Sequence, residues 1–312
     1  MRDWLLLLLL ALACSLLPLA GDNYVLRLGT IVAMYAVLAQ SWNFIGGLAG
    51  YPSFATAAFF GLGAYTSAVL LSYGAPTGLA WTAAGGMACL FAALIGGAIL
   101  HLKGHYFAIA SLAVGEVLRE VVNTTPDLTG GGMGMNLPVP KLSVAAAAQT
   151  FYFSMLALAA LTTAAAIIVQ RSRLGFGLRC IQQNEDAANI LGVNAYGYKT
   201  AAFCLSAVFA GMAGAIYASW VHYIEPPDVF DILLAVKPLV MVLLGGIGTV
   251  FGPIIGAFLL IAFEELVWRS FLTIHAAMLG GIIVVLVLFM PNGLLALVRS
   301  GLARLRPAGP KP

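Results

Sequence analysis

The chain has 312 residues, of which 62% are hydrophobic and only 9% are charged, and its mean hydropathy is +0.99. Soluble domains average about 45–50% apolar and about 25% charged residues, so this composition excludes an ordinary soluble protein and predicts an all-α, polytopic membrane helix bundle. The net charge of +3 comes without a basic block with interleaved aromatic residues, which excludes a nucleic-acid-binding protein.

The N-terminal segment has two interpretations. Arg2 precedes an apolar run from Leu5 to Leu17, and Ala20 stands where a signal peptide would be cleaved. We favour an uncleaved first helix, because many further apolar segments follow. The orientation argued below also requires this helix, since ten spans place both termini on the same side.

About ten membrane-spanning helices are predicted, within a range of eight to ten. A span needs about 20 mostly apolar residues, and in lipid such a run must satisfy its own backbone hydrogen bonds, which favours helix. The region 233–268 fits either two spans or broken helices. The predicted spans are 4–20, 24–45, 53–73, 78–100, 105–123, 148–170, 198–221, 233–250, 252–268 and 272–290.

Lysine and arginine predict the orientation of the bundle. They concentrate in the segment 171–199 and in the tail 299–312, whereas loop 222–232 is acidic with no basic residue and loop 124–147 has only Lys141. Because basic loops stay in the cytoplasm, we expect the first two segments inside and both loops outside. Ten spans then place both termini in the cytoplasm.

Polar residues in the second and third spans are candidates for a substrate path, because polar groups are costly to bury in lipid. Gln40 and Asn43 are three residues apart and share a helix face, and Ser53 and Thr56 follow the next glycine turn. The alternative is that these side chains bond to neighbouring helices.

Two glycine-rich runs resemble each other. GGLAGYP at 46–52 is similar to GGIG at 245–248, which Gly252-Pro253 follows. Paired Gly/Pro interruptions in the two halves of a transporter indicate a substrate path, so Gly245 and Gly246 are added to the candidates. Close helix packing explains the same glycines equally well.

Charged residues inside the fifth span have a local explanation. Glu116, Arg119 and Glu120 stand at i, i+3 and i+4, a spacing that predicts an ion pair on one helix face. We expect a structural role for this cluster near the membrane interface.

The cytoplasmic segment 171–199 contains a short predicted helix. Glu185 and Asp186 favour a helix start, and Gly192 is a candidate C-terminal cap. We expect Ala187, Ala188 and Leu191 to form a small apolar face, which would fit a groove on a soluble partner. An amphipathic linker without a partner is the alternative.

Sequence motifs for chemistry are absent. The chain has neither a G-x-x-x-x-G-K-[ST] nucleotide loop nor an H-E-x-x-H metal pair, and its four cysteines are far apart with no C-x-x-C pair. We therefore expect no enzyme activity and no cofactor or metal bound by this chain.

The motifs together resemble the branched-chain amino-acid permease family of ABC importers, of the LivM type. E-x-A-A-x-x-x-G at 185–192, after the basic SRLG at 172–175, is similar to the coupling motif of ABC importer permeases. The resemblance runs from about Tyr35 to Leu295. Its further pieces are AAFFGLGAY at 57–65, GHYFAIA at 104–110, Gly115-Glu116, LTGG at 128–131, LGVN at 191–194, Tyr198-Lys199, LGGIGT at 244–249 with Gly252-Pro253, and PNGLL at 291–295.

The resemblance implies a transport subunit with several partners. These are a homologous second permease, two cytoplasmic ATPase subunits that bind ATP, and a periplasmic or surface-tethered solute-binding protein. It also implies a bacterial inner (plasma) membrane location, a permease domain at 1–298 and a basic cytoplasmic tail at 299–312. On this reading Glu185, Ala187, Ala188 and Gly192 belong to the coupling helix that receives the ATPase motion.

The substrate is open at this stage. Branched-chain amino acids are the family default, and the family resemblance extends to urea, amides and aromatic or aliphatic carboxylates. Lys237 departs from the family, as does Ala55-Thr56. A lysine in this apolar run would favour an anionic substrate, or it would extend to the headgroups. An ion-coupled secondary transporter and a membrane scaffold are the rival classes, and the E-x-A-A-x-x-x-G segment argues against the first.

Overall fold

The computed structural model describes residues 2–20, 22–139, 143–270 and 280–281. Its elements are almost all helical, with one two-stranded sheet. In chain order they are α1 (Arg2–Ser15), η1 (Leu17–Ala20), α2 (Asn23–Trp42), the π-helical turn η2 (Asn43–Gly47), α3 (Thr56–Ser72), α4 (Thr77–Ile99), α5 (His105–Asn123), α6 (Pro126–Thr129), η3 (Gly131–Met133), β1 (Met135–Asn136), α7 (Val144–Arg171), α8 (Arg173–Gln183), α9 (Glu185–Ile190), α10 (Ala195–Val221), β2 (Tyr223–Ile224), α11 (Pro226–Val229), α12 (Ile232–Gly245) and α13 (Gly252–Ser270).

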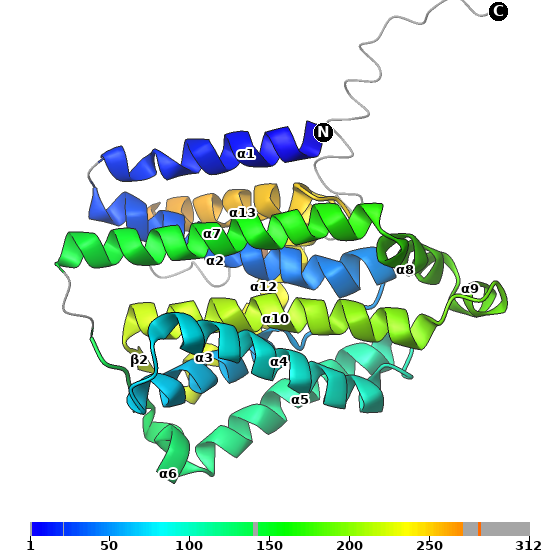
Figure 1. Ribbon diagram of the computed structural model, residues 1–312, viewed down its shortest axis with the longest axis horizontal. Coiled ribbons are helices and arrows are strands. Elements are labelled where there is room, and N and C mark those ends of the chain that lie inside the picture. Colours follow the sequence, from blue (N-terminus) through cyan, green and yellow to red (C-terminus); the bar gives the residue numbers. More distant parts are fainter. Residues whose placement is uncertain (1, 21, 140–142, 271–279, 282–312) are drawn as a thin grey trace, which may run out of the picture.

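Helix α10 lies at the centre of the bundle (Figure 1). It packs against α3 and α4 on one side, while α2 packs against α7 and α13 packs against both α12 and α2. Small residues make the central contact close: a Cβ on Gly63 would lie 2.0 Å from the Gly211 carbonyl oxygen, and one on Gly214 would lie 2.0 Å from that of Phe60. Such close backbone approach is how helices associate in lipid.

Aromatic side chains fill the space around this contact. Phe59 of α3 and Phe107 of α5 both meet Phe203 of α10 edge to face, with ring centroids 5.0 and 6.1 Å apart. Phe44 of η2 stacks on Phe209 of α10 at 6.0 Å. These buried rings tie the π-helical turn and α3 to the same central helix.

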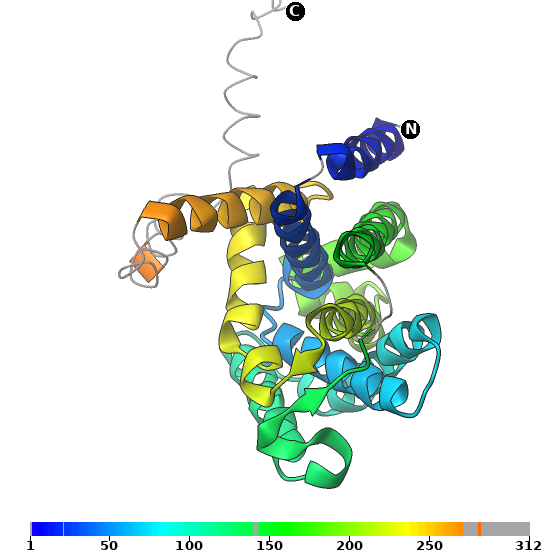
Figure 2. The same ribbon diagram turned by 90° about the vertical axis from the view of Figure 1, so that its left-hand side faces the viewer.

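The long helices α7 and α10 run from one end of the molecule to the other (Figure 1). Helices α8 and α9 lie at one end, and β1, β2, α6 and α11 gather at the other (Figures 1 and 2). The two strands pair antiparallel with Met135 opposite Ile224, which joins loop 124–147 to loop 222–232. The sequence prediction that these two loops share one side, opposite the basic segment 171–199, is confirmed.

The described residues contain fewer helices that qualify as membrane spans than the sequence predicts. Among the described residues, four are long and apolar enough to cross a bilayer: Asn23–Gly47, Thr77–Ile99, Val144–Arg171 and Ala195–Val221. The coarser prediction of an all-α membrane bundle is confirmed, while ten spans and cytoplasmic termini stay predictions. The predicted span 272–290 falls outside the described residues apart from 280–281, and the tail 299–312 lies wholly outside them.

The boundaries of the remaining predicted spans agree with helices of the structure. The predicted span 105–123 coincides with α5, in which Arg119 and Glu116 form the expected ion pair at 3.6 Å. The region 233–268 holds two helices, because α12 ends at Gly245 and α13 begins at Gly252, and neither is among the helices long and apolar enough to span a bilayer, so the choice between two spans and broken helices stays open. Gly246 allows the turn between them, since its φ of 126° is a conformation that other residues rarely adopt.

Candidate functional site

Helix α9 is a short, well-capped helix that projects from the end of the bundle. The Asn184 side chain accepts a hydrogen bond from the Ala187 amide at 3.0 Å, which caps the N-terminus. At the other end the Gly192 amide bonds to the Asn189 carbonyl and the Val193 amide to that of Ala188, with Gly192 at φ 87°. This is the Schellman arrangement, so the predicted glycine cap at Gly192 is confirmed.

The exposed surface of α9 differs from the predicted apolar face. Ala188 is buried against the bundle, whereas Ala187 is exposed and Leu191 is 82% exposed, so these three residues do not share a face. The prediction was wrong because packing below the helix turns Ala188 inward. The apolar tip of this end is instead formed by Ile190, which is 87% exposed, together with Leu191.

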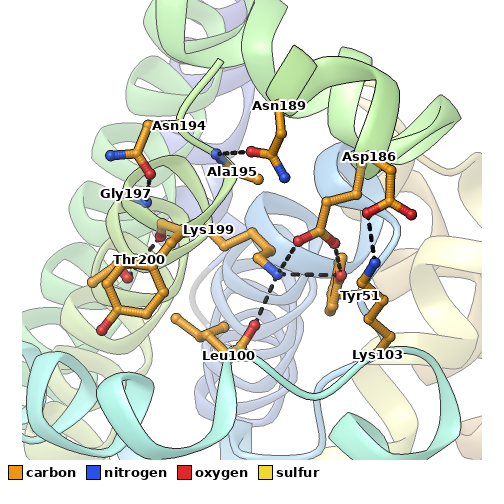
Figure 3. A network of polar contacts seen from close by, with 12 residues as sticks. Tyr51, Leu100, Lys103, Asp186, Asn189, Asn194, Ala195, Gly197, Lys199 and Thr200 are labelled. Atoms are coloured by element: carbon orange, nitrogen blue, oxygen red, sulfur yellow. Dashed lines mark hydrogen bonds and ion pairs between the residues drawn. The ribbon is translucent and has the colours of Figure 1, made fainter. Parts of the chain in front are cut away.

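A buried lysine connects α9 to the rest of the molecule (Figure 3). Lys199 of α10 is only 2% exposed, and its Nζ lies 2.8 Å from the Glu185 carboxylate. The same ammonium donates to the Leu100 carbonyl at 2.8 Å and to the Tyr51 hydroxyl at 3.2 Å. All three ammonium protons therefore have acceptors, which a buried lysine requires.

The Glu185 carboxylate has a second partner besides Lys199. The Tyr51 hydroxyl donates a hydrogen bond to it, and the Lys199 ammonium also lies over the Tyr51 ring at 4.4 Å from the centroid. Burial of Glu185 raises its pKa, but the hydrogen bonds from Lys199 and Tyr51 outweigh burial and hold that pKa below its usual 4.5. The Glu185 carboxylate is therefore ionised at neutral pH.

A second ion pair, which is exposed, also connects α9 to the bundle. Lys103, in the turn between α4 and α5, lies 2.8 Å from the Asp186 carboxylate, and both side chains are exposed. The first turn of α9 is thus bonded to three segments: α10 through Lys199, the turn after α4 through Lys103, and the loop before α3 through Tyr51. Lys199 in turn bonds to the Leu100 carbonyl at the end of α4.

The two glycine-rich runs that resemble each other in sequence meet in space. The Asn43 side chain donates to the Thr249 carbonyl at 2.9 Å and accepts from the Gly248 amide at 3.0 Å. A Cβ on Gly47 would lie 3.0 Å from the Gly248 amide nitrogen, so the two backbones are in close contact. Close backbone contact is what the helix-packing interpretation of these glycines predicts, and their part in a substrate path stays a prediction.

Two glutamines link this contact to the end of the molecule that carries α8. Gln170, near the end of α7, donates to the Gly248 carbonyl at 2.8 Å, and Gln182 of α8 donates to the Gly47 carbonyl at 3.2 Å. Sequence reasoning missed both residues. Their signal was available, since two glutamines flank the basic segment next to apolar spans.

The other candidates for a substrate path are all buried. Gln40 is 1% exposed, and within the described part of the chain neither polar atom of its side chain has a hydrogen-bond partner. Ser53 holds the loop after η2: its hydroxyl accepts from the Ala55 amide and its carbonyl from the Trp42 indole at 2.7 Å. Thr56 begins α3. Their part in a path stays a prediction.

Lys237 forms an ion pair that the sequence analysis did not consider. Its Nζ is 2.9 Å from the Glu264 carboxylate of α13, and the two side chains are 15% and 16% exposed. The lysine is therefore not a free cation for an anionic substrate, and it does not extend to the headgroups. The sequence analysis did not name Glu264, although an acidic residue in an apolar span is a functional candidate by default.

A cavity of about 280 Å³ is lined by Lys237 of this ion pair and by Asp228 of α11. Its wall combines four apolar residues with two tyrosines and three charged residues, and most of its surface is polar. Its lining consists of Met34, Tyr35, Phe60, Tyr217, Asp228, Asp231, Leu233, Leu234 and Lys237.

Comparisons with known proteins agree on one family. The family model described as branched-chain amino acid transport system / permease component matches residues 24–290. The chain is 30% identical to the high-affinity branched-chain amino acid transport permease LivM of Escherichia coli K12, over 95% of this chain and 75% of that protein. It is 26% identical to the permease LivH of the same organism, over 85% of this chain and 92% of that protein. No match was found among solved structures.

Proposed function

The chain belongs to the family of permease components of branched-chain amino acid transport systems, and from this premise we infer how it works. It is a transmembrane permease subunit of an ABC importer for branched-chain amino acids. Its family consists of permease components rather than enzymes, and we propose that ATP is bound and hydrolysed only on partner subunits.

The observation that carries this mechanism is the attachment of α9 to the bundle. A six-residue helix exposes Ile190 and Leu191 at its tip, while a buried ion pair holds its base through Lys199. An exposed apolar tip fits a groove on a soluble partner, and a rigid base transmits displacement of that tip. We propose that α9, with Glu185, Ala187, Ala188 and Gly192, receives the motion of an ATPase subunit.

The transporter complex includes a second permease and ATPase subunits. We propose a heterodimer with a homologous permease, a proposal supported by the similarity of this chain to both LivM and LivH. We further propose two cytoplasmic ATPase subunits, a periplasmic or surface-tethered binding protein, and a bacterial inner membrane location.

The proposed solute path runs past the contact between η2 and the turn after α12. Gln40, Asn43, Ser53 and Thr56 supply polar groups there, and Gly245 and Gly246 allow the backbone to turn. We propose that ATP-driven movement of α9 reaches this contact through α8, because Gln182 bonds to the Gly47 carbonyl.

The test is ATP-driven leucine uptake by the assembled transporter in proteoliposomes. We expect Ile190→Glu combined with Leu191→Glu to reduce uptake at least about 10-fold, because two buried charges at an interface core cost several kcal/mol. The matched control is Met133→Glu, which places the same charge on an apolar residue that is 87% exposed at the opposite end. Uptake that survives the double change, or that requires an ion gradient instead of ATP, contradicts the proposal.

A further inference from the structure

The cavity beside Lys237 has a wall suited to a small solute with both polar and apolar parts. Its volume of about 280 Å³ is just below the range of about 300–1,000 Å³ that holds drug-sized ligands. Met34, Phe60 and Leu234 supply apolar walls, all of them buried. A single aliphatic amino acid is a solute of the right size for this space.

The charges on the wall are not balanced. Lys237 is neutralised by Glu264 at 2.9 Å, but within the described residues neither Asp228 nor Asp231 has an ion-pair partner. The Asp231 carboxylate accepts only the Leu233 amide, at 3.0 Å, as the N-terminal cap of α12. The cavity therefore carries an excess of negative charge, which favours a solute with a cationic group.

Tyr35 adds an independent sign of a ligand. The residue is only 9% exposed and lines the cavity, and within the described part of the chain its hydroxyl makes no hydrogen bond. Its ring already faces a cation, since the Lys237 ammonium lies 5.4 Å from the ring centroid. A hydroxyl on the cavity wall without a protein partner is free to donate a hydrogen bond to a bound solute.

We propose that this cavity binds a zwitterionic aliphatic amino acid. Its ammonium group lies by Asp228 and Asp231, and its carboxylate group accepts a hydrogen bond from the Tyr35 hydroxyl. Its side chain rests on Met34, Phe60 and Leu234. This proposal deepens the proposed function, on which it rests, and it replaces the anionic substrate that an unpaired Lys237 would select.

The test uses cysteine labelling of the assembled transporter, in a chain whose four native cysteines are replaced. In Leu233→Cys we expect a cationic methanethiosulfonate to react about 10-fold faster than an anionic one, because the unpaired carboxylates concentrate cations. Asp228→Asn together with Asp231→Asn brings this ratio close to one. Asparagine also caps helices well, so α12 keeps its start. Asp127→Asn, on the separate helix α6, leaves the ratio unchanged.

Solutes then identify the group that is recognised. We expect L-leucine to slow labelling of Leu233→Cys several-fold, and 4-methylpentanoate, which lacks the ammonium group, to leave it unchanged. Ile232→Cys, one residue away and outside the cavity wall, is labelled at the same rate with or without leucine. Equal rates for the two reagents, or equal protection by the two solutes, overturn the proposal.

A second measurement avoids the introduced cysteine and the binding protein. Equilibrium binding of radiolabelled leucine to the otherwise unmodified complex without its binding protein should weaken about 10-fold in Asp231→Asn and remain unchanged in Asp127→Asn. Absent leucine binding and absent protection alongside intact ATP-driven uptake overturn the site alone. Binding and protection alongside absent ATP-driven uptake overturn the proposed function and leave the site standing.

Discussion

Lys199 is the residue on which the attachment of α9 depends. Replacing it with methionine leaves the Glu185 carboxylate, which is 16% exposed, without its cation. Removing one partner of a buried ion pair costs about 3–5 kcal/mol, because the other charge stays desolvated. We expect Lys199→Met to lower thermal stability in detergent and to uncouple ATP hydrolysis from uptake.

Two further variants separate charge from packing at this position. The double variant Lys199→Met with Glu185→Gln removes both charges, so we expect it to recover a large part of the stability lost in Lys199→Met. Lys103→Met breaks the other ion pair of α9, which is exposed, and should change the melting temperature little. If Lys103→Met were as damaging as Lys199→Met, burial would not be the cause.

The pH dependence of the Glu185–Lys199 pair follows from the lowered pKa of Glu185. Because the folded pKa lies below the usual 4.5, the pair contributes stability above pH 4.5 and loses it as the pH falls through the folded pKa. The melting temperature of the wild type should exceed that of Glu185→Gln by a constant margin between pH 7 and about pH 5. The margin should shrink below pH 4.5. A margin that grows with acidification contradicts this assignment.

Interactions within one helix could be predicted from the sequence, and ion pairs between helices could not. The Gly192 cap and the Arg119–Glu116 pair follow from spacing along one helix. The partners of Lys199 and Lys237 are on other helices, 14 and 27 residues away, and only packing brings them together. Sequence therefore identified Lys237 as unusual without identifying Glu264 as its neutralising partner.

The crossing of α12 and α13 depends on glycine at Gly245. A Cβ at this position would lie 1.8 Å from the Gly252 carbonyl oxygen, which is backbone and cannot swing aside. We expect Gly245→Ala to force the two helices apart and to destabilise the chain by about 1–3 kcal/mol, the usual cost of overpacking. The measurement is thermal unfolding in detergent.

Gly86 of α4 provides the matched control. A Cβ there would meet nothing within 4 Å, so Gly86→Ala adds a methyl group to an open helix face. Alanine favours helix over glycine by about 0.5–1 kcal/mol, and the variant should be neutral or slightly more stable. Equal losses in the two variants would show that glycine content, rather than the helix crossing, limits stability.

Element boundaries were the most predictable feature of the fold. An apolar run and its flanking caps are local, and the predicted span 78–100 matches α4 (Thr77–Ile99) to within one residue at each end. The predicted span 24–45 includes the start of Asn43–Gly47 but did not predict its π-helical form, and the bonds of Asn43 to the distant turn at 248–249 were not predictable from local sequence. The residue types of the sequence therefore identified the candidate path residues, whereas the contacts between them depend on packing that the sequence does not reveal.

The whole molecule separates its charged groups along the axis of α7 and α10. The basic α8–α9 segment lies at one end, and the acidic loop beside β2 lies at the other (Figure 1). The first helix follows the same polarity, since Asp3 pairs with Arg171 at 2.5 Å at the basic end. A solute entering the acidic cavity and a nucleotide-driven push on α9 thus act on opposite ends of one bundle.

This polarity predicts a definite orientation in the membrane. Because basic segments stay in the cytoplasm, we expect α9 inside and the loop that carries Met133 outside. In intact cells that express an otherwise cysteine-free chain without ATPase subunits, a membrane-impermeant maleimide should label Met133→Cys and leave Ile190→Cys unreacted. Permeabilised cells should label both, because the two side chains are 87% exposed in each case. Labelling of Ile190→Cys in intact cells would show that the molecule has the opposite orientation, with α9 facing away from any cytoplasmic ATPase.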